Sequence, residues 1–354
     1  MLNIAIEKTA APKVKPDESS LGFGRHFTDH MFVMDYSKDL GWHDAKIIPF
    51  DNLTLHPAST VFHYGSEIFE GLKAYRAPDG GVQLFRPEEN IKRMNVSAER
   101  LCLPQLDEEF ALKALTTFVD LERDWVPNSP GTSLYLRPFM FGCDAFLGVH
   151  AVDNAKFIII ASPVGSYYAE GINPVSIMIE TDDVRAVRGG TGYAKCGGNY
   201  AASNRAGERA EKKGYSQVLW LDGVERKYIE EVGAMNVMFM VGDEIVTPAL
   251  TGSILPGVTR KSCIELLREQ GYKVSERLFS IDELAESLSN GTLKEAWGCG
   301  TAAVVSPIGK LVLNDKDYVI NNGEIGEVTQ MLYDTLTGIQ WGKKEDTHNW
   351  IVRV

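Results

Sequence analysis

The segment GGTGYAKCGGNY, residues 189–200, holds a single lysine, Lys195, among five glycines. Glycine suits places where the backbone approaches a ligand closely or takes a positive φ angle. A lysine in such a tight and poorly solvated turn can lose its proton, and its neutral amine can then attack an aldehyde to form a Schiff base. The alternative is a solvated lysine in a flexible glycine-rich loop, and the spacing alone favours that alternative.

Two other segments could bind a phosphate group. In LPGVTR, residues 255–260, Pro and Gly come just before an expected helix, which leaves the amides of Val258 and Thr259 open at its positive end. Ordinary capping of the helix by Thr259 is the alternative. GCGTA, residues 298–302, offers a second set of amides and a hydroxyl, although a plain turn between two strands would look the same.

Glu231 lies in a strand-like run, YIEEVGAMN, just before a glycine. Its carboxylate could pair with a cationic ring nitrogen or simply face water. The common nucleotide and hydrolase motifs are absent from the sequence. Ala194 and Cys196 stand where a P-loop needs Gly and Ser or Thr, no full GxGxxG follows a strand, and no GxSxG occurs. These absences argue against the commonest nucleotide-binding and hydrolase classes.

Composition narrows the class of protein further. A chain of 354 residues favours two domains, and 44% hydrophobic with 24% charged residues is typical of a globular protein. The formal net charge of -12 argues against a nucleic-acid or anionic-membrane surface. No apolar run reaches the roughly 20 residues of a bilayer span. Residues 1–20 lack the apolar stretch of a secretory signal and contain acids but no Arg, so we expect a flexible arm and a cytoplasmic protein.

The cysteines and histidines predict neither a disulfide framework nor a metal site. The five cysteines are odd in number and include no CxxC pair, so we expect reduced, mostly buried thiols. His26 and His30 would share one face of a strand, but no further ligand is nearby.

The helices and strands that must position the candidate residues can be predicted from the sequence pattern. Strands are predicted at 30–36, 81–85, 133–141 and 156–161, with helices beginning at Pro87 and covering 106–125. Residues 162–174, with two Pro and two Gly, are the best candidate for a linker. Later elements are strands 175–180 and 217–221, helices 199–213, 258–270 and one capped by Ser280, and a hairpin of 228–240 with 244–246.

Seven of these segments, in order, are FTDHM, HYGSEIFEGLKAYR, LYLRPFMFG, GGTGYAKCGGNY, EEVGAMNVMF, LPGVTR and GCGTAA. Together they resemble the branched-chain aminotransferases, which are fold-type IV pyridoxal-phosphate enzymes. The resemblance runs from about Phe23 to the C-terminus. It implies an α/β (α+β) fold of two domains, with the active site between them, in a homodimer. The expected divisions are a flexible arm at 1–22, a small α/β domain at 23–161, the linker at 162–174, and a large cofactor-binding domain at 175–354.

The resemblance also implies a role for individual residues. Lys195 corresponds to the lysine that holds pyridoxal 5'-phosphate as a Schiff base and moves the substrate's α-proton. Glu231 corresponds to the acid that pairs with the pyridine nitrogen, and Tyr200 to the tyrosine near the phenolic oxygen. The phosphate would be bound by Arg93, Val258, Thr259 and Thr301. The substrate would be bound by the aromatic wall of Phe23, Tyr64, Tyr135 and Tyr167, by Thr301 and Ala302 at the α-carboxylate, by Arg137 when glutamate is the substrate, and by Val149 from the other subunit.

The implied reaction is ping-pong transamination between leucine, isoleucine or valine and 2-oxoglutarate, giving the branched-chain 2-oxo acid and L-glutamate. Two alternatives within the fold type are a D-amino-acid aminotransferase and an aminodeoxychorismate lyase. A cofactor-binding protein without turnover is the alternative outside enzymes. The sequence departs from the family where Ala303 and Ser306 replace a redox CxxC pair, so a thiol switch is not expected. Ala234 replaces a common Thr, which puts one hydroxyl contact in doubt.

Overall fold

The computed structural model describes residues 2–165, 172–313 and 316–354. Tyr167 and part of the predicted linker therefore lie outside the described residues. The chain divides into two compact units. Unit 1 comprises Met1–Ala169, Ala194–Gly197 and Gly338–Val354, and unit 2 comprises Glu170–Tyr193 and Gly198–Thr337. Lys195 thus groups with unit 1, although the boundaries drawn from the sequence put it in the C-terminal domain. Those boundaries stay a prediction.

Unit 1 is built on a nine-stranded sheet with the order β1-β3-β2-β8-β7-β5-β6-β18, in which β4 also pairs with β7. Both β4 and β5 pair antiparallel with β7, at different parts of its length. The strands are β1 (Ala5–Ile6), β2 (His30–Ser37), β3 (Gly41–Pro49), β4 (Glu67–Phe69), β5 (Leu72–Arg76), β6 (Val82–Phe85), β7 (Ser133–Gly142), β8 (Asn154–Val164) and β18 (Ile351–Arg353).

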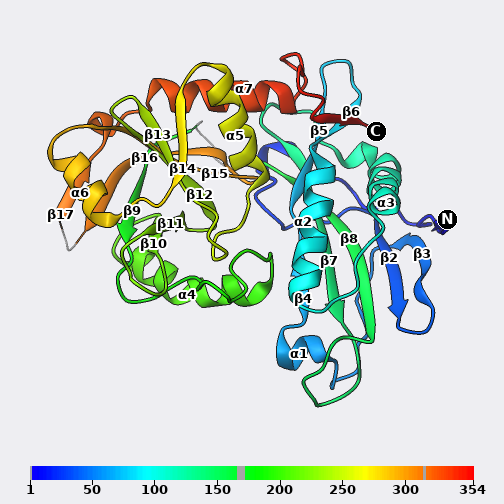
Figure 1. Ribbon diagram of the computed structural model, residues 1–354. Coiled ribbons are helices and arrows are strands. Elements are labelled where there is room, and N and C mark those ends of the chain that lie inside the picture. Colours follow the sequence, from blue (N-terminus) through cyan, green and yellow to red (C-terminus); the bar gives the residue numbers. More distant parts are fainter. Residues whose placement is uncertain (1, 166–171, 314–315) are drawn as a thin grey trace. The chain divides into compact units, whose positions relative to one another are not determined.

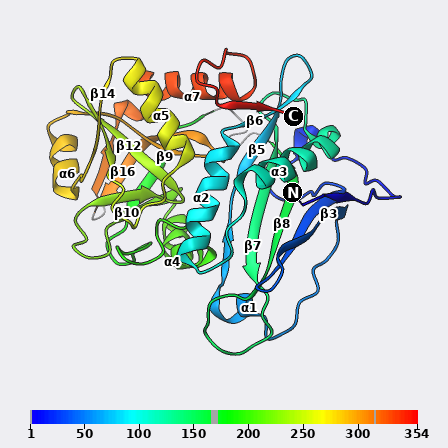
Figure 2. The same ribbon diagram turned by 45° about the vertical axis from the view of Figure 1, so that its right-hand side comes forward.

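Two helices, α2 (Pro87–Arg100) and α3 (Glu108–Leu121), cover one face of this sheet (Figures 1 and 2). The helix predicted to begin at Pro87 is confirmed, with Pro at its start and two acids in its first turn. Asp107 caps α3 by accepting a hydrogen bond from Phe110 N. The smaller elements of unit 1 are α1 (Thr60–Tyr64) and the 3-10 turns η1 (Glu18–Ser20) and η2 (Arg123–Trp125).

Alternation along β7 decides which side chains can form a site. Leu134, Leu136 and Met140 belong to the core beneath α2 and α3. Successive side chains of a strand point to opposite faces of the sheet, so Tyr135 and Arg137 lie on the face away from these helices. The sheet thus separates an apolar core on one side from a face that carries polar and aromatic residues.

Unit 2 contains the second sheet, with the order β11-β10-β9-β16-β15-β12-β13-β14 and with β17 on β16. Because β11 also pairs with β12, six of these strands close into a ring. The strands are β9 (Val175–Ile179), β10 (Gln217–Leu221), β11 (Ile229–Val232), β12 (Met235–Val241), β13 (Glu244–Pro248), β14 (Lys273–Arg277), β15 (Leu293–Gly300), β16 (Val304–Leu313) and β17 (Lys316–Val319). The helices of this half of the chain are α4 (Gly197–Lys212), α5 (Val258–Glu269), α6 (Ile281–Ser289) and α7 (Glu327–Gln340), with the 3-10 turn η3 (Asn321–Gly323).

The segment predicted to be a flexible arm makes defined contacts within unit 1. Strand β1 pairs parallel with β3. Thr9 N donates to Nε2 of His30 at 2.9 Å, and Lys13 N donates to Oδ1 of Asp29 at 2.7 Å. These contacts could not be anticipated from the sequence. The two hydrogen bonds join residues far apart in the chain, and a strand of only two residues shows no periodicity.

Two general properties follow from the described parts of the chain. No helix there combines the length and apolar character that crossing a bilayer requires. No group of three or more His, Cys, Asp or Glu side chains in the same residues is arranged to hold a metal ion. The prediction of an α/β fold is confirmed by the two mixed sheets and their helices.

Candidate active site

The backbone around Lys195 is held by three hydrogen bonds within unit 1. Phe69 N, on β4, donates to the carbonyl oxygen of Lys195 at 2.9 Å. Lys195 N donates to Oγ of Ser97, on α2, at 2.9 Å. Gly197 N donates to Oε1 of Glu67, also on β4. The segment is therefore fixed on both sides of the lysine, and the alternative of a flexible loop does not describe this structure.

The side chains of Lys195 and Arg137 both lie against the aromatic ring of Phe69. Lys195 Nζ lies 4.8 Å from the centroid of the Phe69 ring, and Cζ of Arg137 lies 4.7 Å from the same centroid. Arg137 Nη2 also donates to Oη of Tyr135 at 2.9 Å. The ring of Phe23 meets that of Tyr135 edge to face, with centroids 4.9 Å apart. Four predicted site residues are thus brought together through Phe69.

Sequence reasoning did not name Phe69 as a site residue, although it lies in the segment HYGSEIFEGLKAYR. Its place in that motif was the one signal that could have found it. The neighbouring Gly71 is required for the same group of side chains, because a Cβ atom at this position would overlap the hydroxyl of Tyr135. A glycine in this strand connection therefore makes room for the tyrosine.

One nitrogen of the Arg137 guanidinium is available to donate a further hydrogen bond. Its Nε is buried and has no hydrogen-bond partner among the described residues. Leaving such a donor unsatisfied costs about 1–3 kcal/mol, and more when the group is charged. An anionic ligand that accepted a bond from this nitrogen would remove the cost, so the arrangement suits recognition of a carboxylate.

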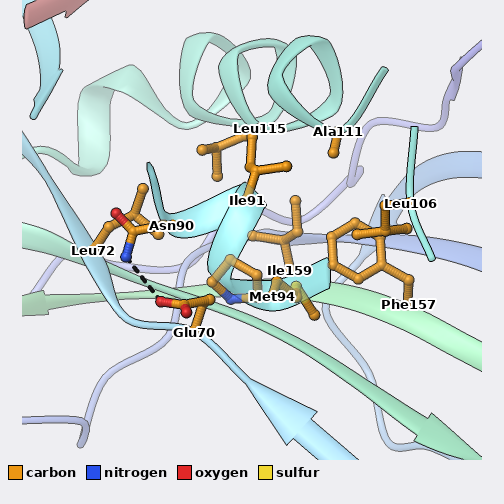
Figure 3. A pocket seen from close by; sticks show the side chains of 11 residues that line it. Glu70, Leu72, Asn90, Ile91, Met94, Leu106, Ala111, Leu115, Phe157 and Ile159 are labelled. Atoms are coloured by element: carbon orange, nitrogen blue, oxygen red, sulfur yellow. Dashed lines mark hydrogen bonds between the residues drawn. The ribbon is translucent and has the colours of Figure 1, made fainter. Parts of the chain in front are cut away.

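Arg93 lies on α2 and forms a buried ion pair with Glu70. Its Nε and Nη2 each lie 2.8 Å from a different carboxylate oxygen of Glu70. Asn90 Nδ2 donates to the same carboxylate at 2.8 Å, as Figure 3 shows. Burial alone would raise the pKa of Glu70, but the charge and hydrogen bonds of Arg93 outweigh it and hold that pKa below its ordinary value. The pair fixes the direction of the Arg93 guanidinium.

The cavity beside Glu70 is not a substrate site. Its volume is about 10 Å³, which leaves room for at most one water molecule. Apolar side chains from α2, α3 and the sheet line most of it (Figure 3). This hollow belongs to the core of unit 1, and only Glu70 and Asn90 bring polar groups to its edge.

In unit 2, Glu231 is buried on β11 and does not face water, so that alternative is excluded. Its Oε2 lies 2.8 Å from Nε of Arg185, and its Oε1 accepts a hydrogen bond of 2.8 Å from Leu255 N. Arg185 was not among the predicted site residues, since it carries no local motif. The neighbour of Glu231 in sequence, Glu230, is also buried, bonds to the hydroxyl of Ser253, and has a pKa raised by burial.

Helix α5 begins at Val258, and its N-cap is Gly257, which offers no side chain to cap the first turn. Thr259 is the second residue of the helix and is buried, so the alternative of capping by Thr259 is wrong. A Cβ atom at Gly257 would overlap Oδ1 of Asn236. A buried helix start without a side-chain cap, and with glycine required before it, suits an anion such as a phosphate.

Asn236 connects the candidate segments of unit 2. It pairs with Glu231 on one side and with Cys299 on the other, and its Nδ2 donates to Leu255 O at 2.9 Å. Glu231, segment 255–259 and the turn after Gly300 are therefore brought together around Asn236. Thr301 and Ala302 lie in that turn, between β15 and β16, and both are half-buried.

The other predicted residues lie elsewhere in the chain. Tyr200 is half-buried on α4. Tyr64 ends α1 with 42% of its surface exposed, and Val149 is 84% exposed. Tyr167 lies outside the part of the chain that the structure describes.

Comparison with known proteins identifies the family. The family model named amino-transferase class IV matches residues 67–311. The chain is 56% identical over 351 residues to the branched-chain-amino-acid aminotransferase 2 of Bacillus subtilis, covering 99% of this chain and 97% of the relative. This chain therefore belongs to the class IV aminotransferase family.

Two solved structures support the same assignment. A branched-chain amino acid aminotransferase from Escherichia coli has a TM-score of 0.76 and 27% identity, over 91% of this chain and 98% of the other. Another structure of a branched-chain amino acid aminotransferase from Escherichia coli has a TM-score of 0.72 and 25% identity, again over 91% of this chain and 98% of the other. The family resemblance seen in the sequence is confirmed.

Proposed function

We propose that this chain transfers the amino group of leucine, isoleucine or valine to 2-oxoglutarate, and back, with pyridoxal 5'-phosphate as its cofactor. One observation carries the assignment: the amine of Lys195 and the guanidinium of Arg137 lie against the same ring of Phe69, and one buried nitrogen of Arg137 has no hydrogen-bond partner in the described parts of the chain. The amine suits attack on a carbonyl group, and the guanidinium suits a second carboxylate. The relative at 56% identity bears the name of a branched-chain aminotransferase.

The residues present fit pyridoxal phosphate in charge and chemistry. The open start of α5 at Val258 and Thr259 suits a phosphate, and buried Glu231 suits a protonated pyridine nitrogen. When bound, this cofactor supplies an aldehyde carbon for an amine and a ring that takes up electrons from the substrate's α-carbon. We assign the cofactor to Lys195, Arg93, Tyr200, Glu231, Val258, Thr259 and Thr301.

Lys195 has two tasks in this proposal. Its amine anchors the cofactor between turnovers, and during turnover it removes and returns the proton of the substrate's α-carbon as general base and acid. The hydrogen bonds on either side of Lys195 restrict the backbone, which limits the positions that Nζ can reach. A base held in this way is oriented before the substrate arrives.

The pocket must accept two unlike side chains. Phe23 and Tyr135 offer an apolar wall, against which each buried methylene contributes about 0.8 kcal/mol. Arg137 meets the distal carboxylate of glutamate, which would be costly to bury unpaired. Thr301 and Ala302 hold the α-carboxylate. We assign the rest of the wall to Tyr64, Tyr167 and, from a second subunit, Val149.

We further propose a homodimer, which the placement of Val149 supports. Val149 follows Phe146 and Leu147, which are 60% and 67% exposed, so apolar side chains project from this segment. Contiguous exposed apolar residues mark interaction sites. We also propose a cytoplasmic location, since five cysteines without a disulfide among them suit a reducing compartment. Sedimentation of the purified protein and cell fractionation would test these two assignments.

The experiment that tests the function is a coupled assay of the purified protein with a panel of amino acids. We expect leucine, isoleucine and valine to react with 2-oxoglutarate, with glutamate as a product. D-Alanine should give no reaction. Preference for a D-amino acid, or a cofactor spectrum that leucine leaves unchanged, would contradict the proposal.

A further inference from the structure

Glu67 lies on the same face of the unit 1 sheet as the pocket residues. In the ladder between β4 and β7, Glu67 is opposite Phe141 and Phe69 is opposite Phe139. Ile68, between them in sequence, belongs to the core beneath α2 and α3. Alternation therefore directs Glu67 and Phe69 to the opposite face, the one that carries Arg137.

The Glu67 carboxylate is held in place. Its Oε1 accepts the hydrogen bond from Gly197 N, at the first residue of α4. A Cβ atom at Gly197 would overlap this oxygen, so a glycine is needed for the contact. The Glu67 carboxylate is thus fixed beside Gly197, which follows Lys195 by two residues in the chain.

Arg137 is a cation on the same face of the sheet as the Glu67 carboxylate. Its guanidinium lies over the ring of Phe69, which is two residues from Glu67 on the same face of β4. Burial raises the pKa of Glu67, whereas the bond from Gly197 and the positive charge of Arg137 lower it in part. The guanidinium of Arg137 and the carboxylate of Glu67 therefore lie at neighbouring places on one face of the sheet, and no ion pair joins them among the described residues.

The proposed pocket needs a negative charge near Arg137 when the bound substrate is apolar, and Glu67 supplies one. When an apolar amino acid is bound, no substrate carboxylate reaches Arg137, and a partly buried cation without a counter-charge is costly. A nearby fixed carboxylate reduces that cost. When glutamate is bound, the same carboxylate repels the distal carboxylate of the substrate. Glu67 therefore favours apolar side chains over acidic ones.

We propose that Glu67 determines the specificity of this pocket by serving as the resident counter-charge of Arg137, at the expense of glutamate affinity. The inference rests on the proposed function, because it takes Arg137 as the receptor for the distal carboxylate. It adds that the balance between branched-chain and acidic substrates is set by a residue that binds neither. Glu67 is not a catalytic residue in this sense, since its charge acts on Arg137 and on the distal carboxylate of glutamate without binding either substrate.

Two variants separate the charge of Glu67 from its hydrogen bond. Glu67→Gln keeps an oxygen that can accept from Gly197 N and removes the charge. We expect the KM for glutamate to fall about threefold to tenfold, as removal of one partly screened repulsion would give. The ratio of kcat/KM for glutamate to that for leucine should rise by a similar factor. Glu67→Leu removes both features, so both half-reactions should slow.

A measurement on the cofactor-free protein checks that the variants do what is intended. Hydrogen exchange at the amide of Gly197 should stay slow in Glu67→Gln and become faster in Glu67→Leu. Glu108→Gln, which removes an exposed charge at the start of α3, is the matched control and should change neither exchange nor the substrate ratio. An unchanged substrate ratio in Glu67→Gln, with slow exchange retained, would overturn the inference.

A further variant separates a failure of the role of Glu67 from a failure of the proposed role of Arg137. Arg137→Met is measured alongside. If that variant loses glutamate turnover selectively while Glu67→Gln leaves the ratio unchanged, Arg137 keeps its role and only the part of Glu67 fails. If Arg137→Met affects leucine and glutamate equally, the receptor for the distal carboxylate lies elsewhere and both assignments fall.

Discussion

Lys195 and Arg137 lie against one aromatic ring, with Nζ and Cζ 4.8 and 4.7 Å from the centroid of Phe69. The proposed catalytic amine of Lys195 and the guanidinium proposed to bind the substrate's side chain are therefore positioned by the same residue. Cation–ring attraction of this kind contributes about 0.5–2 kcal/mol, depending on how far water is excluded. A single change at Phe69 should disturb reactivity and recognition together.

Phe69→Leu tests this coupling. We expect kcat/KM to fall about tenfold for leucine and for glutamate alike, because both cations lose the ring of Phe69 and Arg137 keeps only the ring of Tyr135, at 5.3 Å. Phe139→Leu removes the ring of the residue opposite Phe69 on β7 and is the matched control. Steady-state kinetics on both variants provide the comparison. A loss as large in Phe139→Leu would point to general packing instead.

Lys195→Ala should lower turnover by several orders of magnitude, because it removes both the anchor of the cofactor and the general base. Reduction of the native protein with borohydride, followed by peptide mapping, should find the pyridoxyl group on Lys195. A label on any other lysine would contradict the assignment. Circular dichroism of the variant serves as the control for folding.

Arg93→Ala should weaken cofactor binding by about 2–5 kcal/mol, which is the usual cost of removing one partner of a buried charged pair. The change also leaves the buried carboxylate of Glu70 without its guanidinium. A double variant with Glu70→Gln removes that stranded charge, so it should recover stability but not cofactor affinity. Equilibrium dialysis and thermal unfolding measure the two effects separately. Unchanged cofactor affinity would show that Arg93 has only a structural role.

Arg137→Met keeps the bulk of the side chain and removes its charge. The glutamate half-reaction should lose roughly 2–5 kcal/mol of transition-state stabilisation, and the leucine half-reaction much less. Single-turnover measurements follow each half-reaction by itself. Equal losses would make Arg137 a structural residue, with Tyr135 as the partner whose position it holds.

Lys73, on β5, should make the stability of the protein depend on pH. Burial lowers the pKa of Lys73 to about 8, from an ordinary value of 10.5. Between these two values the unfolded chain holds a proton that the folded chain has released, so the free energy of unfolding rises with pH across this window. Lys73→Met should be more stable than the native protein at pH 7, by up to about 3 kcal/mol. Chemical denaturation across pH 7–10.5 should show the two curves converging.

The longer elements could be predicted because their patterns are local. The cap at Asp107 and the Pro at Pro87 mark the starts of α3 and α2, and the helix predicted from 258 matches α5. The predicted strand at 228–240 is in fact two strands, since the chain turns at Gly233 and Ala234 between β11 and β12. Strand β4 has only three residues, too few to show periodicity.

The candidate site was harder to predict, because its decisive contacts join distant parts of the chain. The bond from Gly197 to Glu67 spans 130 residues, and that from Lys195 to Ser97 spans 98. Glu231 could be named from its motif, but Arg185 carries no signal until β11 and the segment before α4 are placed. Local pattern indicated the reactive residues, and the folded sheet was needed to find the residues that hold them.

The two outer strands of the unit 1 sheet, β1 and β18, come from opposite ends of the described chain. Each covers a neighbour, β3 or β6, that would otherwise present a row of unpaired backbone groups to other molecules. Exposed strand edges of this kind invite edge-to-edge association and aggregation. Removing residues 5–6 or 351–353 should therefore lower the yield of dispersed protein even where the catalytic groups are untouched. A purification tag joined directly to either strand carries the same risk, and a short spacer rich in charged residues would reduce it.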